Sequence, residues 1–224
     1  MSPAPEAVAE LFRPFAVRVA FVPVAGAAAG DLPFRVDDFL SPQAVPRRRD
    51  SFAAGRLAAA RATHDLTGRA LWPLRDARGA PVWPPGVRGS ISHTGDLAVS
   101  VVARGPDAAV GIDLERAARA ATPLATASWS CGPEETRRLR ALRGSARGLA
   151  ALRLLCAKEA LYKAGPATRH APSALRSVHL EWTEPEHPGA VVPLTVRARA
   201  GSPWSAFTVR TQVLNGYLVA AAAR

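Results

Sequence analysis

Hydrophobic residues recur along the chain with two different spacings. Alternation with polar residues predicts short strands, whereas recurrence every three to four residues predicts helices. The expected strands cover residues 17–24, 90–93, 97–103, 110–115, 178–182, 191–199, 206–213 and 217–223, and the expected helices cover residues 46–68, 133–144 and 146–164. The order of strand, helix and strand meander therefore occurs twice along the chain.

This repeated order predicts an α+β protein of two similar α+β lobes that meet near residues 115–130. We expect residues 1–120 to form the N-terminal lobe and residues 121–224 to form the C-terminal lobe. Turn residues at 94–96 and 104–107 separate the three strands before residue 115, which indicates an antiparallel meander. Residues 72–85 are rich in Pro, Gly, Trp and Arg, and we expect them to form an irregular loop.

Composition narrows the class of protein. A length of 224 residues suits one large domain or two small lobes, and 48% hydrophobic residues exclude a disordered chain. Neither of the two cysteines lies in a metal-binding or CxxC spacing, which favours a reducing, cytoplasmic location. No apolar run reaches the roughly 20 residues of a membrane span, so we expect no membrane partner. A formal net charge of +11 predicts anionic partners.

Two carboxylates stand two residues apart in the strand expected at 110–115. Asp113 and Glu115 point to the same face of that strand, while Ile112 and Leu114 point to the other. Carboxylates placed side by side repel unless a cation lies between them, so the pair predicts a divalent metal site with the oxygen ligands that Mg²⁺ prefers. The alternative is that Glu115 lies at an exposed strand end.

A third acid lies in the expected helix at 146–164. Glu159 and Lys163 stand among leucines on a helix that is apolar on both sides, and such a helix is normally buried. Because a buried carboxylate needs a partner or a metal, both residues are candidates for a functional site. The alternative is an ordinary helical ion pair on a wet face.

Several cations and hydroxyls are candidates for binding phosphate. Ser92 and His93 end one expected strand, and arginines gather at the start of the first helix and in the following loop. Guanidinium groups suit phosphate, although a basic patch can also be a solvated face. No GxSxG, P-loop or GxGxxG motif is present, so hydrolase, nucleotide triphosphatase and dinucleotide-binding functions lack their usual motifs.

Taken together, these segments resemble the 4′-phosphopantetheinyl transferases that activate carrier proteins of nonribosomal peptide, polyketide and siderophore synthesis. The resemblance rests on the segments Arg48-Arg49-Asp-Ser-Phe52…Gly55-Arg56, Gly79-Ala-Pro81-Val-Trp83-Pro84, Gly89-Ser-Ile-Ser-His93, Val110-Gly-Ile-Asp-Leu-Glu115 and Cys156-Ala-Lys-Glu-Ala-Leu-Tyr-Lys163. Leu155 replaces an aromatic residue common in the last motif, and Ala80 replaces a lysine found in some members.

The resemblance implies transfer of the 4′-phosphopantetheine arm of coenzyme A to a serine of an acyl or peptidyl carrier protein, with release of 3′,5′-ADP. By this resemblance, Asp113, Glu115 and Glu159 hold Mg²⁺ or Mn²⁺, and Glu159 is also the base. Lys158 and Lys163 are expected to be catalytic and to contact the coenzyme. The remaining expected coenzyme contacts are Arg48, Arg56, Arg75, Ser92, His93 and Asp113. The resemblance also implies that pseudo-twofold symmetry relates the two lobes and that the active site lies between them. We expect a monomer.

Two other functions remain open at this point. A nucleic-acid-binding module would explain the arginines and the five tryptophans but not the three acids. A non-catalytic relative that only binds carrier proteins is disfavoured by the retained Asp113, Glu115, Glu159 and Lys163. We therefore expect an enzyme that does not bind nucleic acid.

Overall fold

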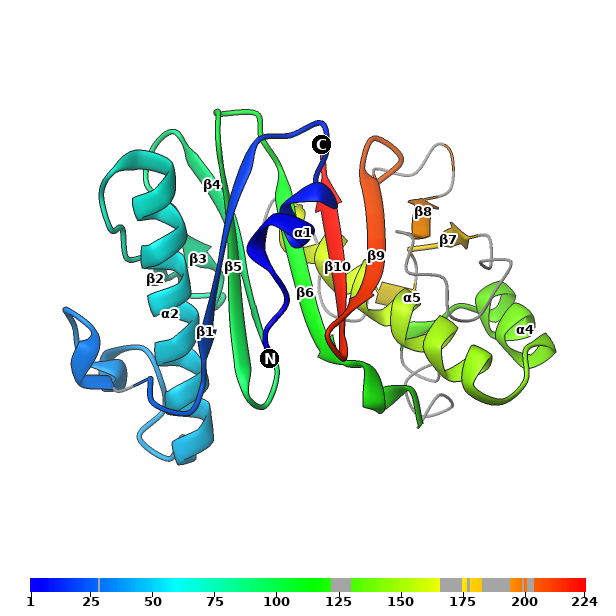
Figure 1. Ribbon diagram of the computed structural model, residues 1–224, viewed down its shortest axis with the longest axis horizontal. Coiled ribbons are helices and arrows are strands. Elements are labelled where there is room, and N and C mark those ends of the chain that lie inside the picture. Colours follow the sequence, from blue (N-terminus) through cyan, green and yellow to red (C-terminus); the bar gives the residue numbers. More distant parts are fainter. Residues whose placement is uncertain are drawn as a thin grey trace.

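The computed structural model describes residues 1–27, 29–121, 130–165, 175–176, 178–182, 194–198, 200 and 204–224. Figure 1 shows the arrangement of the helices and strands. The α-helices are α1 (Pro5–Glu10), α2 (Pro46–Thr67), α4 (Pro133–Ala141) and α5 (Gly144–Ala164), and short 3₁₀ helices are η1 (Ala29–Asp31), η2 (Val36–Asp38) and η3 (Ala117–Ala121). The strands are β1 (Val17–Pro23), β2 (Leu74–Arg75), β3 (Pro81–Val82), β4 (Val87–His93), β5 (Leu97–Arg104), β6 (Val110–Arg116), β7 (Leu180–Trp182), β8 (Leu194–Ala198), β9 (Thr208–Leu214) and β10 (Tyr217–Ala223).

Two antiparallel sheets form the centre of the molecule. One has the strand order β1-β5-β4, and the other has the order β6-β10-β9-β8-β7. Strands β4 and β6 lie side by side where the two sheets meet (Figure 1). The sequence expectation of an α+β protein with two α+β halves is confirmed.

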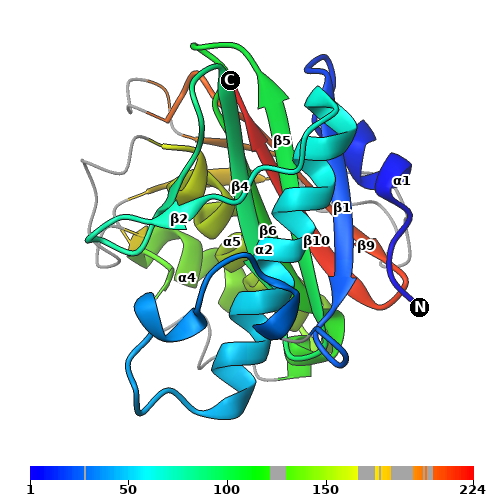
Figure 2. The ribbon, with the colours of Figure 1, turned by 90° about the vertical axis from the view of Figure 1, so that its left-hand side faces the viewer.

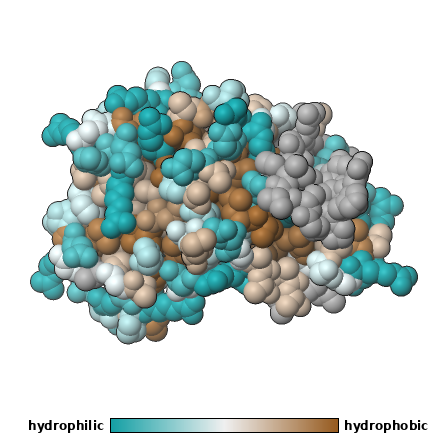
Figure 3. Space-filling model, viewed as in Figure 1, coloured by the Kyte–Doolittle hydropathy of each residue, from teal (hydrophilic) through white to brown (hydrophobic). Residues whose placement is uncertain are grey.

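Helices cover both faces of these sheets. Helix α1 packs over one face, where a single apolar cluster joins it to β1, β5, β6 and β10. Helix α2 covers the opposite face of the first sheet, and α5 covers the second (Figure 2). The space-filling view of the α1 side shows apolar residues across its middle and polar residues around its edges (Figure 3).

The sequence of α2 explains where it begins and ends and how closely it packs. Pro46 occupies the first turn, where its missing N–H costs no hydrogen bond. Gly68 ends the helix with a φ of 78°, a left-handed conformation that glycine adopts without strain. Buried alanines, including Ala54 and Ala58, bring the helix close to the sheet.

Helix α5 lies directly on β6 because of one glycine. A Cβ atom added at Gly111 would lie 1.9 Å from the carbonyl oxygen of Ala160, so a larger residue would push the helix off the strand. This close contact places the carboxyl-terminal turns of α5 over the face of β6 that carries Asp113. The two carboxylate-bearing elements are therefore fixed against each other by backbone packing.

The expected meander of three strands is wrong at its third strand. Strand β4 pairs with β5 as expected, but β6 pairs with β10, whose Ala220 lies opposite Asp113. The reason is that alternation indicates which residues form a strand but not which partner it takes. The loop at 72–85 contains one small hairpin, formed by β2 and β3.

The two-lobe division at residue 120 stays a proposal. Strand β6 belongs to the sheet of the C-terminal strands, although it lies within the expected N-terminal lobe. Parts of the strand expected at 191–199 lie outside the described residues, and β8 covers Leu194–Ala198. In the part of the chain that the structure describes, no helix has the length and apolar character needed to cross a membrane.

Candidate active site

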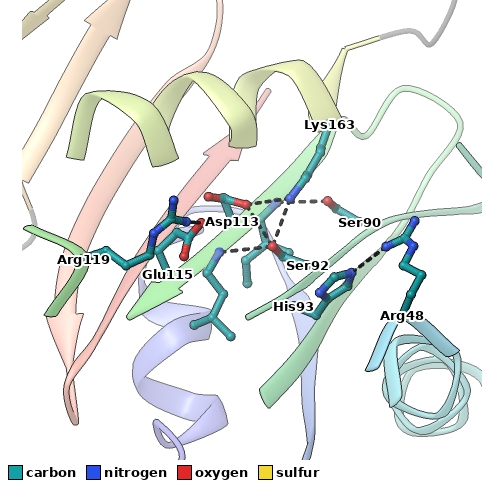
Figure 4. A network of polar contacts seen from close by, with 10 residues as sticks. Arg48, Ser90, Ser92, His93, Asp113, Glu115, Arg119 and Lys163 are labelled. Carbon is teal, nitrogen blue, oxygen red and sulfur yellow. Dashed lines mark hydrogen bonds and ion pairs between the residues drawn. The ribbon is translucent and has the colours of Figure 1, made fainter. Parts of the chain in front are cut away.

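The candidate site follows the line along which β4 and β6 lie side by side, which we call the seam. The amide of Ile112 donates a hydrogen bond of 3.1 Å to Ser90 Oγ, and the amide of Leu114 donates one of 3.2 Å to Ser92 Oγ. Both pairs are separated by 22 residues, so the two strands run in the same direction. At the seam, serine hydroxyls therefore take the place of the backbone carbonyls that would accept these hydrogen bonds within a sheet (Figure 4).

Ser92 also holds two of the expected site residues. Its hydroxyl donates to Asp113 Oδ1 at 2.9 Å and accepts from Lys163 Nζ at 3.0 Å, besides accepting from the amide of Leu114. A serine hydroxyl has one hydrogen and two lone pairs, so its hydrogen-bonding capacity is filled. In the structure the buried hydroxyl positions Asp113 and Lys163, and the coenzyme contact expected of Ser92 stays a prediction.

Asp113 and Lys163 form an ion pair across the contact between β6 and α5. Lys163 Nζ lies 2.6 Å from Asp113 Oδ1, and the exposed fractions of the two side chains are 26% and 9%. Burial alone would lower the pKa of Lys163, but attraction to Asp113 and the hydrogen bond between them raise it above its ordinary value. Lys163 is therefore a fixed positive charge on the seam.

Glu159 lies one helical turn before Lys163, and its side chain is half-buried. Burial raises the pKa of its carboxyl, and the negative charges of Asp113 and Glu115 raise it further, whereas Lys163 lowers it. The three carboxylates therefore interact electrostatically, as a shared cation site requires. A carboxylate with a raised pKa is also a better proton acceptor near neutral pH than an ordinary one.

Glu115, in contrast, is held by an arginine. Its carboxylate forms an ion pair and hydrogen bond with Arg119 of η3 (Figure 4). Among the described residues, no three His, Cys, Asp or Glu side chains are arranged as a ready metal site. The donor set still fits Mg²⁺, because all three candidates are carboxylates, and the charges of Asp113 and Glu115 both act on Glu159. Glu115 would join such a site through the carboxylate that contacts Arg119 in the structure.

Beside the seam lies a hollow of about 440 Å³, which we call the arginine pocket. Its lining residues are Val45, Arg47, Arg48, Ser51, His93, Thr94, Gly95, Glu115 and Arg119. Arg48 Nη1 lies 3.2 Å from His93 Nε2. Burial lowers the pKa of His93 to about 4, and the positive charges of Arg48 and Lys163 contribute to the shift. At neutral pH this histidine is uncharged in the protein without ligands.

Arg56 is buried near this pocket with an exposed fraction of only 5%. Its guanidinium stacks over the Phe52 ring at 4.5 Å, and among the described residues nothing accepts a hydrogen bond from its Nε. Burial lowers its pKa to about 10, and the positive charges of Arg75 and Arg48 add to the effect. Arg75 itself donates hydrogen bonds to the carbonyls of Gly79 and Phe39. A buried cation without an anion indicates a site where an anionic ligand binds.

Lys158 corrects one of the sequence expectations. Its side chain is fully buried away from the seam, with Nζ 2.6 Å from Glu135 Oε2 and 2.7 Å from the carbonyl oxygen of Ser130. The Glu135 carboxylate also accepts hydrogen bonds from the backbone amides of Gly132 and Leu180. Because Lys158 is committed to this buried pair, it does not reach the charge that develops at the reacting phosphate. Its position links α5 to α4 and β7.

A second hollow of about 260 Å³ lies beside an earlier part of β4, residues 89–91. It is lined by Arg78, Gly79, Ala80, Pro81, Gly89, Ser90, Ile91, Tyr162, Lys163 and Gly165. Lys163 reaches both this hollow and the carboxylate of Asp113. A long ligand that passes over the end of β4 would therefore meet the arginine pocket, the seam and this second hollow in turn.

Comparison with known proteins agrees with this geometry. A family model described as the 4′-phosphopantetheinyl transferase superfamily matches residues 109–222, and one described as the 4′-phosphopantetheinyl transferase N-terminal domain matches residues 37–103. Because the first match alone covers just over half of the chain, the protein belongs to the 4′-phosphopantetheinyl transferase superfamily. The resemblance stated from the sequence motifs is therefore confirmed.

Individual relatives match part of the chain. Enterobactin synthase component D of Escherichia coli (strain K12) is 36% identical over 118 residues, which are 53% of this chain and 55% of that protein. The 4′-phosphopantetheinyl transferase Svp of Streptomyces mobaraensis is 45% identical over 75 residues, which are 33% of this chain and 30% of that protein. The chain thus spans about half the length, or less, of these curated relatives.

Three contributors to the site region were missed by sequence reasoning. Ser90 stands two residues before Ser92 and shares its face of β4, a spacing that could have been recognised. Glu135 lies in the first turn of α4, where an acid is expected for capping alone. Arg119 lies four residues after Glu115, but Glu115 is in a strand, so the sequence offered no reason to read this spacing as a helical pair.

The lowered pKa of His93 gives a pH prediction. In the folded protein without ligands, a nuclear magnetic resonance titration of the His93 ring should have its midpoint near 4, below the ordinary 6.5. Between these values the unfolded chain binds more protons than the folded chain, so stability falls as the pH falls through this window and is fully present above it. His93→Gln assigns the signal. A midpoint at or above 6.5 would show that burial and Arg48 do not act as described.

Proposed function

We propose that this protein transfers the 4′-phosphopantetheine arm of coenzyme A to a serine of an acyl or peptidyl carrier protein and releases 3′,5′-ADP. The observation that carries the proposal is Arg56, a buried guanidinium with no anion bound to its Nε among the described residues. It lies on one side of the seam, and the interacting carboxylates of Asp113, Glu115 and Glu159 lie on the other. Membership of the superfamily supports the same activity.

Coenzyme A is a polyanion that suits the cationic side of the site. Arg48, Arg56 and Arg75 would bind its 3′-phosphate, and His93 would donate a hydrogen bond to it. Guanidinium groups bind phosphate through paired N–H donors, which fixes the orientation of the ligand. Because Arg56 is already buried and positioned, little conformational freedom is lost on binding.

The carboxylate side would hold the metal ion. Asp113, Glu115 and Glu159 would be the protein ligands of Mg²⁺ or Mn²⁺, and the bound ion supplies positive charge that stabilises the diphosphate and the departing 3′,5′-ADP. Lys163, held by Asp113 and Ser92, would offset negative charge on the phosphoryl group that is transferred. This role explains why a fixed cation stands among the acids.

The chemical step needs a proton acceptor. Glu159, or a water that it orients, would take the proton from the carrier serine hydroxyl. The serine oxygen would then bond to the phosphorus that carries the pantetheine arm, and the bond from that phosphorus to the bridging diphosphate oxygen would break. The electron pair leaves with 3′,5′-ADP, and the chain's own groups act by positioning and by charge.

The partner protein would be acidic. The net charge of +11 favours encounter with both a polyanionic coenzyme and an acidic carrier protein. The name of one relative, enterobactin synthase component D, supports a carrier protein of a synthase as the substrate. A monomeric state and a cytoplasmic location stay predictions.

The transfer reaction is tested by measuring the intact mass of the carrier protein. Incubation of the protein with a carrier protein, coenzyme A and Mg²⁺ should raise the carrier mass by one phosphopantetheine arm, and a chelator should stop the reaction. Glu159→Gln should lower turnover by more than about 10²-fold, because it removes both a ligand and the base. Glu181→Gln, an exposed acid on β7, is the control. Coenzyme binding without any transfer would identify a non-catalytic relative.

The 3′-phosphate contact is tested by a double-mutant cycle. Arg56→Ala should weaken binding of coenzyme A by about 1.5–3 kcal/mol, the range of a charge-assisted contact, and should barely change binding of 3′-dephospho-coenzyme A. Arg61→Ala, which removes an exposed arginine from the same helix, should affect neither ligand. Equal losses for both ligands in Arg56→Ala would reject the contact. Calorimetric titration measures all six affinities.

A further inference from the structure

The arginine pocket contains one acid among several cations. Of the described residues that line it, Glu115 alone carries a carboxylate, and Arg47, Arg48 and Arg119 carry guanidinium groups. Arg119 forms its ion pair with that same carboxylate. The pair therefore places a positive and a negative charge, neutralised by each other, on the wall of a pocket that the proposed function assigns to an anion.

The two members of this pair differ in their exposure to solvent. The Glu115 side chain is 18% exposed and rises from the fixed strand β6, whereas the Arg119 side chain is 52% exposed and belongs to the short helix η3. An exposed ion pair of this kind is weak, typically worth about 0–1 kcal/mol. A divalent cation that attracts Glu115 can therefore displace Arg119 easily.

We propose that Arg119 couples metal binding to coenzyme binding: when Glu115 turns to a divalent cation, Arg119 turns from Glu115 to the anionic coenzyme in the arginine pocket. The inference rests on the proposed function, because it takes Glu115 as a metal ligand and the pocket as a phosphate site. It adds a residue that the sequence motifs do not contain. Before the metal binds, the charge of Arg119 is neutralised by Glu115.

The coupling has a definite sign in both directions. The metal should raise the affinity for coenzyme A partly through Arg119, and coenzyme A should raise the affinity for the metal by the same factor. A metal ion that contacts both the protein and the coenzyme diphosphate would couple the two affinities without any contribution from Arg119. The contribution of Arg119 is therefore isolated only by removing Glu115 and Arg119 separately and together in metal-free protein.

The experiment is a calorimetric titration of coenzyme A into metal-free protein with a chelator present. Glu115→Gln should tighten binding by at least about threefold, because Arg119 then turns to the ligand without help from a metal. Arg119→Ala alone should change the affinity by less than about twofold. In the double variant, most of the gain from Glu115→Gln should be lost.

The chain offers a matched control pair. Glu134 and Arg137 of α4 form a comparable ion pair, three residues apart and 57% and 76% exposed, away from the pocket. Glu134→Gln and Arg137→Ala change the net charge by the same amounts and should leave coenzyme affinity unchanged. These controls separate a local effect of Arg119 from long-range electrostatic attraction.

The same titrations with Mg²⁺ complete the test. Arg119→Ala should now weaken binding by at least about threefold, in contrast to its small effect without metal. If Glu115→Gln gives the same gain with and without Arg119, Glu115 acts only by its own charge and the inference is overturned. An equal effect of Arg119→Ala in both conditions overturns it as well. If coenzyme A binds to no variant in either condition, the proposed function itself fails.

Discussion

The hydrogen bonds along the seam are the constraint on which the rest of the site depends. Strands β4 and β6 belong to different sheets, and the amides of Ile112 and Leu114 would lack acceptors if the two sheets simply met there. Ser90 and Ser92 supply the acceptors through their side chains. Because a hydroxyl can also donate, Ser92 satisfies the backbone and orients Asp113 with the same oxygen. A backbone ladder could not do both.

This arrangement holds opposite charges close together without neutralising all of them. The cations on the α2 side include a buried Arg56, and on the α5 side burial and the neighbouring acids raise the pKa of Glu159. Lys163 crosses between the sides and is fixed by Ser92 and Asp113. A ligand with phosphates at one end and a reacting diphosphate further along satisfies both sides at once, which is the chemistry of coenzyme A. Gly111 keeps α5 close enough for this to work.

The sequence was sufficient to predict much of this site and insufficient for the rest, for physical reasons. Asp113 and Glu115 share a face because side chains alternate along a strand, and Glu159 and Lys163 share a face because helical residues four apart do. Lys158 was expected at the site but lies buried beside Glu135. A helix that is apolar all round does not indicate which way each of its polar residues points. Glu135, the partner of Lys158, is 23 residues away.

The pairing of strands and the position of Arg119 depend on tertiary structure. Strand β6 pairs with β10, which lies about a hundred residues further along the chain, and no local pattern specifies that pairing. The Glu115–Arg119 contact depends on how η3 leaves the end of β6, which residue types alone do not determine. Local periodicity therefore predicted the elements and several site residues, while the seam required the assembled sheets.

The most direct test of this account is the turnover number of Ser92→Ala at saturating coenzyme A, carrier protein and Mg²⁺, measured on protein shown to be folded. Loss of one hydroxyl frees Asp113 and Lys163 to shift, and misplacement of reacting groups by about 1 Å can cost 10²-fold in rate. Ser100→Ala is the matched control, because the Ser100 hydroxyl is equally buried but bonds only to the carbonyl of Ser90 within its own sheet. The account predicts a loss of more than tenfold (~10²-fold at most) for Ser92→Ala and little change for Ser100→Ala. Wild-type turnover in Ser92→Ala would contradict it.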